Sequence, residues 1–144
     1  MIDLIELINQ PDKNERLANS WQKRIAWESI RNRGIKGLKQ YGVYFASFWI
    51  YGLHEPTRAR IIKSGYFWLR HIDDIVDGDK ELPSGIQSKE AYLDNKERLV
   101  GLLTQSALPG NLMGEEADSL LVDYLQTSKN IGFSLVEETY AILD

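Results

Sequence analysis

Apolar residues recur three or four positions apart along most of the chain, which predicts a succession of amphipathic helices. The pattern covers 14–39, continues through the aromatic-rich stretch 41–53, and resumes over 58–77, 88–105, 114–128 and 133–143, after a short segment at 1–9. Glycine or proline separates these segments at Pro11, Pro56, 78–85, 108–111 and Gly132, and Gly34 and Gly37 are expected to end or bend the segment 14–39. We therefore expect a single all-α domain over residues 1–144, built from about six or seven helices.

The helical period also predicts which side chains are buried. Within 14–39 the expected core positions are Leu17, Trp21, Ile25, Trp27 and Ile30. Within 58–77 they are Ile61, Ile62, Trp68, Leu69, Ile72, Ile75 and Val76. Further along the chain they are Tyr92, Leu99, Leu102, Leu103, Ala117, Leu120, Leu121 and Leu125. Each set falls on one face of its helix, as a packed bundle requires.

The segment 58–77 carries an unusual polar stripe beside its apolar face. At 100° per residue, four side chains spaced i, i+4, i+7 and i+11 lie within an arc of roughly 60°. They are Tyr66, Arg70, Asp73 and Asp77. Asp74 lies at the edge of the arc. Carboxylates at i and i+4 repel each other by roughly 0.2–0.5 kcal/mol, and burial beside a core increases that cost unless a cation compensates it.

Two interpretations of these aspartates stay open. An isolated Asp-Asp-x-x-Asp on a helix is often a solvated acidic face. Because the stripe borders the core and includes an arginine, we favour a site for a hard divalent cation. Mg²⁺ takes oxygen ligands, usually from one or two carboxylates, and completes its shell with waters and substrate phosphates. Arg70 would donate to such a phosphate or orient the carboxylates.

Composition narrows the remaining chemistry. The chain has 144 residues, no cysteine and two histidines, which excludes disulfides, thiolate metal sites and multi-histidine centres. We interpret His71 as a structural or surface histidine and not as a metal ligand. Net charge is −4, yet residues 1–72 hold twelve basic against six acidic residues and residues 73–144 hold five against fifteen. Such asymmetry can indicate nucleic-acid binding, but the basic residues form no run, so we expect no nucleic-acid partner.

Neither a basic leader nor an apolar run of about 18 residues is present, so we expect a cytoplasmic protein without a transmembrane helix. The apolar stretch 43–53 is long enough only to contact a membrane peripherally or to accept a lipid tail.

The sequence Tyr-Phe-Trp-Leu-Arg-His-Ile-Asp-Asp-Ile-Val-Asp-Gly at 66–78 resembles the first aspartate-rich helix of the squalene/phytoene synthase family. In that family a tyrosine and then an arginine precede the acidic motif at the same spacing. Arg60 matches a further arginine, and Ser47-Phe48 followed by Pro56 matches the family's Ser-Phe and proline. The family commonly has an acidic residue where Gly78 stands. The specific matches cover roughly residues 40–80.

The resemblance implies a class I isoprenoid synthase fold and a Mg²⁺-dependent, head-to-head condensation of prenyl diphosphates such as farnesyl or geranylgeranyl diphosphate. Asp73, Asp74 and Asp77 would hold the metal. Ser47, Phe48, Arg60, Arg70 and Tyr66 would bind the substrate, with Tyr66 and Arg70 also acting in catalysis. Tyr66 would position the diphosphate or assist proton transfer.

A second aspartate-rich helix, which the family places across the bundle, has no match after Asp79. We therefore expect this chain to correspond to an N-terminal half, whose exposed apolar lining pairs with a second chain or a second copy. The alternative is a non-catalytic helical binding or interaction module that retains the aspartate-rich helix.

Overall fold

The computed structural model describes residues 1–132, apart from the side-chain surroundings at positions 37, 40, 41, 44, 45 and 48. Its elements are β1 (Ile2–Asp3), α1 (Leu4–Asn9), α2 (Pro11–Arg33), α3 (Ile35–His54), α4 (Pro56–Val76), α5 (Lys89–Leu103), β2 (Met113–Gly114), η1 (Glu116–Asp118) and α6 (Ser119–Asn130). The structure therefore confirms the all-α class. The helix expected at 133–143 lies outside the described residues.

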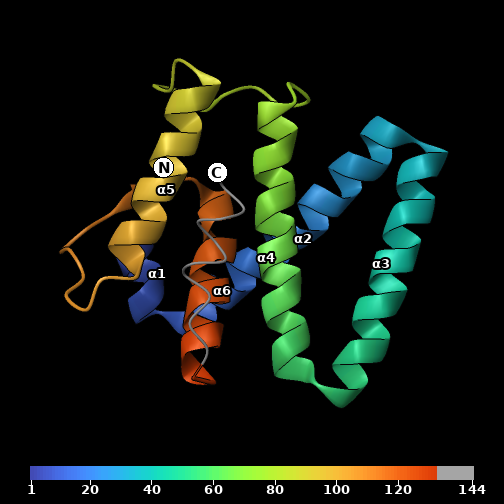
Figure 1. Cartoon of the computed structure of the whole chain (residues 1–144), viewed down its shortest axis with the longest axis horizontal. Helices are drawn as coiled ribbons and strands as arrows, with labels where there is room; N and C mark the ends of the chain where they lie inside the picture. Colours follow the sequence, from blue (N-terminus) through green and yellow to red (C-terminus); the bar gives the residue numbers. More distant parts are fainter. Residues whose placement is uncertain (133–144) are drawn as a thin grey trace.

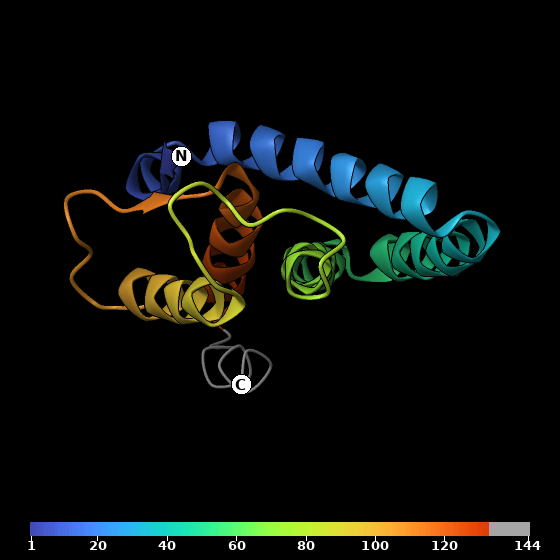
Figure 2. The same cartoon turned by 90° about the horizontal axis from the view of Figure 1, so that it is seen from above.

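Helix α4 stands in the middle of the molecule (Figure 1). Helix α3 runs beside it on one flank, and α5 and α6 occupy the other flank (Figure 1). Helix α2 crosses the others along one side, as the view from above shows (Figure 2). Helix α6 packs against both α4 and α2, and α3 packs mainly against α2 and α4.

Local sequence signals set the helix boundaries. Pro56 begins α4 at a position where its missing N–H is not needed, and Ser88 caps α5 by accepting a hydrogen bond from the Ala91 amide at 3.0 Å. Gly34, with φ of +62°, separates α2 from α3. Gly37 instead lies inside α3. The short antiparallel pair β1–β2, which the sequence did not predict, ties the N-terminus to the segment before η1.

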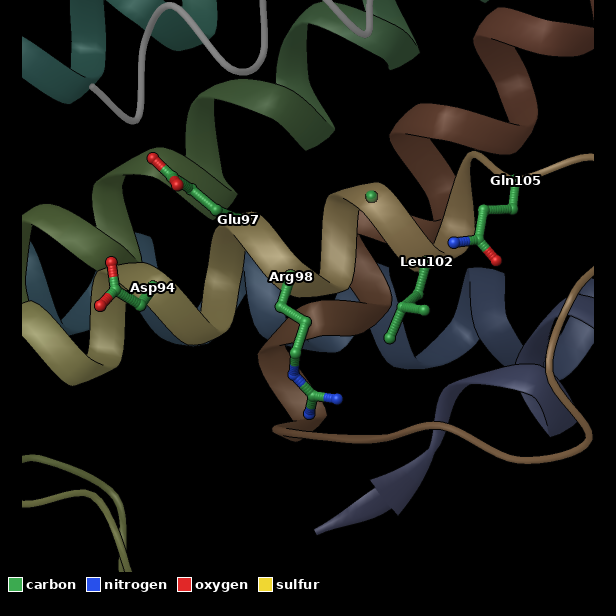
Figure 3. Close-up of a pocket in the computed structure, with 6 residues that line it drawn as sticks. Asp94, Glu97, Arg98, Leu102 and Gln105 are labelled. Atoms are coloured by element: carbon green, nitrogen blue, oxygen red, sulfur yellow. The ribbon is translucent and has the colours of Figure 1, made fainter.

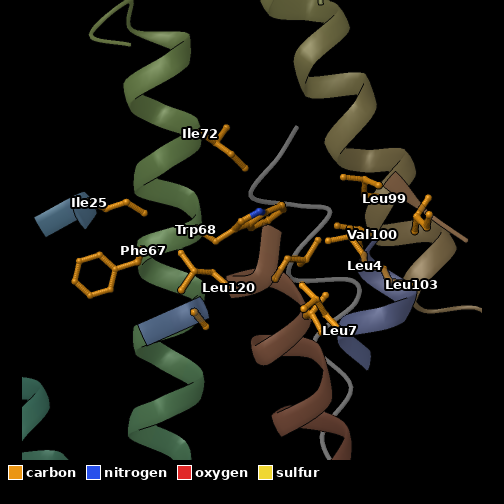
Figure 4. Packing of buried hydrophobic residues seen from close by; sticks show 14 of the residues in the cluster. Leu4, Leu7, Ile25, Phe67, Trp68, Ile72, Leu99, Val100, Leu103 and Leu120 are labelled. Carbon is orange, nitrogen blue, oxygen red and sulfur yellow. The ribbon is translucent and has the colours of Figure 1, made fainter. Parts of the chain in front are cut away.

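The core lies between α4, α5, α6 and the N-terminal segment (Figure 4). Trp68, Ile72, Leu99, Val100 and Leu120 are among its fully enclosed members. Most predicted core positions are buried or half-buried. Two predictions are wrong: Trp27 is 66% exposed and Ile62 is 46% exposed. Periodicity identifies the apolar face of a helix, but it does not say which neighbour, if any, covers the edge of that face.

A buried charge network joins α5 to α4 through η1. Lys96, only 1% exposed, places its Nζ 2.6 Å from Glu115 Oε2 and 2.8 Å from both Asp118 oxygens. Trp68 Nε1 donates to Asp118 at 3.0 Å, and the Tyr92 hydroxyl donates to Glu115 at 2.8 Å. Burial would raise the pKa of Glu115, but the hydrogen bond from His71 and the charge of Lys96 outweigh it and lower that pKa to about 2.

Candidate functional site at the acidic end of helix α4

The acidic residues gather where α4 ends. Asp73 lies in the last turn, and Asp77 is the C-cap residue, whose amide donates to the Asp73 carbonyl at 2.8 Å. Gly78 follows with φ of +84°, the left-handed conformation that commonly terminates a helix. An acidic side chain at position 78, as in the resembled family, would be strained in this conformation. Both Asp73 and Asp77 are exposed to solvent.

The electrostatic setting of this pair is unfavourable without a cation. Partial burial raises the pKa of Asp73, repulsion from Asp77 raises it further, and the positive charge of Arg33 offsets part of the shift. The last turn of α4 contains no basic residue. The negative end of the helix dipole therefore acts on both carboxylates, which costs typically 0.3–1 kcal/mol for each.

Asp74 differs from its two neighbours because it is buried. Its Oδ1 lies 3.4 Å from Arg70 Nη2. Burial raises the pKa of Asp74, while the charges of Lys80 and Arg33 lower it. The structure thus separates Asp74 from the exposed pair, and within residues 1–132 no three histidine, aspartate or glutamate side chains are grouped so that they could hold a metal ion.

Arg70 has unused hydrogen-bonding capacity. Its side chain is 12% exposed, and its Nε and Nη2 atoms are buried without a hydrogen-bond partner. Buried guanidinium donors are rarely left unsatisfied, because their desolvation costs free energy that a hydrogen bond would recover. An anion that reaches this guanidinium would supply the missing acceptors. Tyr66, one turn earlier, is half-buried and packs edge-on against Phe67 at 5.2 Å between ring centroids.

The remaining predicted substrate residues lie elsewhere. Arg60 is thirteen residues before Asp73, which separates them by roughly 20 Å along the helix axis. Its Nε donates to Asp123 on α6 at 3.1 Å. Ser47 is exposed on α3, and the side-chain surroundings of Phe48 lie outside the described part of the chain. The structure therefore brings Tyr66, Arg70, Asp73 and Asp77 onto one helix but does not bring Arg60 to them.

Lys80 holds the loop that follows the aspartates. Its Nζ lies 2.6 Å from Glu28 Oε2 and 3.4 Å from His71 Nδ1, and its amide donates to the Asp74 carbonyl at 3.1 Å. His71 is buried, and its other ring nitrogen lies 3.3 Å from Glu115. Sequence reasoning missed Lys80 and Glu28, since neither belongs to a helical stripe.

A shallow depression of about 560 Å³ follows the outer face of α5 (Figure 3). It is lined by Asp94, Glu97, Arg98, Gly101, Leu102 and Gln105. Two acidic side chains and one basic side chain, Asp94, Glu97 and Arg98, share this face of the helix. The helical spacing of charges predicts a solvated face that also includes Lys96; for Lys96 that prediction is wrong, because its side chain is buried. None of the site residues considered above lines the depression.

Comparisons with protein-family models, with curated proteins and with solved structures give no match for this chain. Among the described residues, no helix has the length and hydropathy needed to cross a membrane.

Proposed function

We propose that the C-terminal end of α4 binds the diphosphate group of a prenyl diphosphate together with Mg²⁺, as part of a squalene/phytoene synthase-like prenyltransferase. The observation that carries this proposal is the exposed carboxylate pair of Asp73 and Asp77 at the negative end of a helix, beside an arginine with unsatisfied donors. A cation would remove the repulsion within the pair, and a bound anion would satisfy the arginine.

The exposed carboxylates at the end of α4 match the ligands that magnesium prefers. Two exposed carboxylates, Asp73 and Asp77, would hold the ion, and substrate phosphate oxygens and waters would complete its shell, which is the arrangement this cation commonly adopts. Asp74, expected to be a third ligand, serves better as a positioning residue because it is buried against Arg70. Arg70 and Arg33 would contact the phosphate oxygens, and Tyr66 would help to position the diphosphate.

When bound, Mg²⁺ would neutralise negative charge on the diphosphate and so make it a better leaving group. The protein would have to keep water away from the allylic carbon. The surface of α3 offers apolar side chains that could exclude water, since it exposes Ile35, Leu38, Val43, Trp49, Ile50 and Leu53. Trp49 is 69% exposed, and residues 40–53 contain no charged side chain. A second chain or second copy over α3 would enclose the prenyl tail.

Calorimetric titration with farnesyl diphosphate tests this proposal. We expect binding that requires Mg²⁺, is abolished by EDTA, and is lost in Asp73→Ala. The matched control is Asp94→Ala, which removes an exposed carboxylate from the outer face of α5. Titrations with farnesol and with inorganic pyrophosphate, done separately, measure how much of the affinity comes from the apolar tail and how much from the diphosphate.

The alternative is a non-catalytic helical interaction module that retains the aspartate-rich helix. The exposed apolar surface of α3 favours it, because a protein partner would cover that surface equally well. Farnesyl diphosphate binding that is equally weak with Mg²⁺ and with EDTA, and unchanged in Asp73→Ala, would support this module and contradict the prenyltransferase.

A further inference from the structure

A second site lies at the opposite end of α4 from the aspartates. A cavity of about 390 Å³ opens between α1, the first two turns of α2, the first turns of α4 and one side of α6. Leu7, Ile8, Val122 and Ile131 contribute its apolar wall. Its charged and amide side chains are Asn14, Glu15, Arg60, Asp123, Gln126 and Asn130. The cavity therefore offers a ligand both an apolar wall and a larger number of polar groups.

The unsatisfied side chain of Asn14 is the observation that favours a ligand in this cavity. The residue is 4% exposed, and its Oδ1 is buried without a hydrogen-bond partner, yet it lines the cavity. Buried side-chain oxygens are almost always hydrogen-bonded, since an unsatisfied one costs roughly 1–3 kcal/mol. A hydrogen-bond donor inside the cavity would remove this cost.

The charges in the cavity favour a cation over an anion. Arg60 and Asp123 neutralise each other: Arg60 Nε lies 3.1 and 3.2 Å from the two carboxylate oxygens, and the Ser64 hydroxyl donates to the same carboxylate at 2.5 Å. Glu15 is left with only a long contact, 3.5 Å from Arg60 Nη1, and half of its side chain is exposed. One negative charge at the mouth is therefore only partly compensated.

We propose that this cavity binds a small primary ammonium compound with a short alkyl chain. The ammonium group donates to Asn14 Oδ1 and to the Glu15 carboxylate, and the alkyl chain packs on the apolar wall formed by Leu7, Ile8 and Val122. An ammonium has three N–H donors and no acceptor, so two of its donors match the Asn14 and Glu15 oxygens and the third faces solvent at the mouth of the cavity. The proposal is independent of the magnesium diphosphate site, since the two share no residue.

NMR titration of the ¹⁵N-labelled full chain with n-butylammonium tests the proposal, with n-butanol and butyrate as probes of the same length. We expect saturable shifts of the Asn14 and Glu15 signals with butylammonium, weaker ones with butanol and none with butyrate. Glu15→Gln is expected to weaken butylammonium binding about fivefold, the effect of losing a partly exposed ion pair. Glu90→Gln, an exposed change on α5, is the control and leaves the affinity unchanged.

Substitutions of Asn14 decide the sign of the ligand charge. Asn14→Asp keeps the shape and adds a negative charge, so it strengthens butylammonium binding, whereas Asn14→Leu abolishes it. If Asn14→Leu fails to fold, Asn14→Asp and Glu15→Gln still decide the question. Equal or tighter binding of butyrate, weaker butylammonium binding in Asn14→Asp, or an absence of saturable shifts at these residues would overturn the proposal.

Discussion

Replacement of Lys96 by methionine tests the buried charge network that fixes α5 against η1. Methionine preserves most of the aliphatic volume and removes the ammonium group, so lost packing contributes little. The change leaves Asp118, which is fully buried, and Glu115, which is mostly buried, without their shared cation. Breaking a buried ion pair by removing one partner typically costs 3–5 kcal/mol. That loss is a large share of the 5–15 kcal/mol that stabilises an ordinary domain.

Urea denaturation followed by circular dichroism measures the loss. Lys89→Met, an exposed change in the first turn of the same helix, is the control and is expected to change the free energy of unfolding by less than about 0.5 kcal/mol. The double variant Lys96→Met/Asp118→Asn also removes one of the two carboxylate charges that Lys96→Met leaves unpaired. It is expected to recover part of the lost free energy of unfolding. A loss below about 1 kcal/mol in Lys96→Met, or no recovery in the double variant, would refute the network as a stabilising element.

Three further changes test the acid dependence, the α2–α3 turn and the aspartate pair. Because the pKa of Glu115 is lowered from 4.5 to about 2, its stabilisation is complete above its unfolded pKa and disappears as pH falls from 4.5 toward 2. Glu115→Gln should therefore reduce the difference in unfolding free energy measured between about pH 7 and about pH 3; an unchanged difference argues against this assignment. Gly34→Ala places a side chain at φ of +62° and should cost roughly 1–3 kcal/mol in urea denaturation. Gly42→Ala, in open space within α3, should instead stabilise by about 1 kcal/mol, and equal effects would contradict the turn geometry. Asp77→Asn relieves repulsion from Asp73 at a helix C-terminus and should raise the metal-free free energy of unfolding by about 0.5 kcal/mol. A decrease measured in EDTA would show that the carboxylate already has a stabilising partner.

Several helix boundaries could be predicted from the sequence because their signals are local, whereas the pattern over 114–128 placed the start of α6 too early, since that helix begins at Ser119. Pro56, Ser88 and Gly34 act on the backbone within one turn of their own positions, so the starts of α4 and α5 and the break after α2 follow from a single sequence. The pair β1–β2 could not be predicted, since two residues on each side carry no periodicity. The exposure of Trp27 and Ile62 depends on which helices lie beside them, which no local pattern records.

The site shows the same division between local and long-range information. The stripe of Tyr66, Arg70, Asp73 and Asp77 is a property of one helix, so spacing alone placed these residues together. Asp74 lies only one residue from Asp73, yet it turns into the interior. The burial of Asp74 depends on Arg70, Lys80 and the packing of α2. The 2.6 Å contact between Lys80 and Glu28 joins segments about fifty residues apart, which no local pattern records. Arg60 likewise pairs with Asp123 through a tertiary contact that spacing cannot show.

The most direct test of the central claim locates the metal. Mn²⁺ can replace Mg²⁺ at oxygen sites and broadens the NMR signals of nearby nuclei, so titration of the ¹⁵N-labelled chain with Mn²⁺ and pyrophosphate reports where the ion binds. We predict selective broadening of the amide signals of Asp73, Asp77 and Gly78, and its disappearance in Asp73→Asn/Asp77→Asn. Broadening centred on other acidic residues, or broadening that persists in the double variant, would contradict a magnesium diphosphate site at the end of α4.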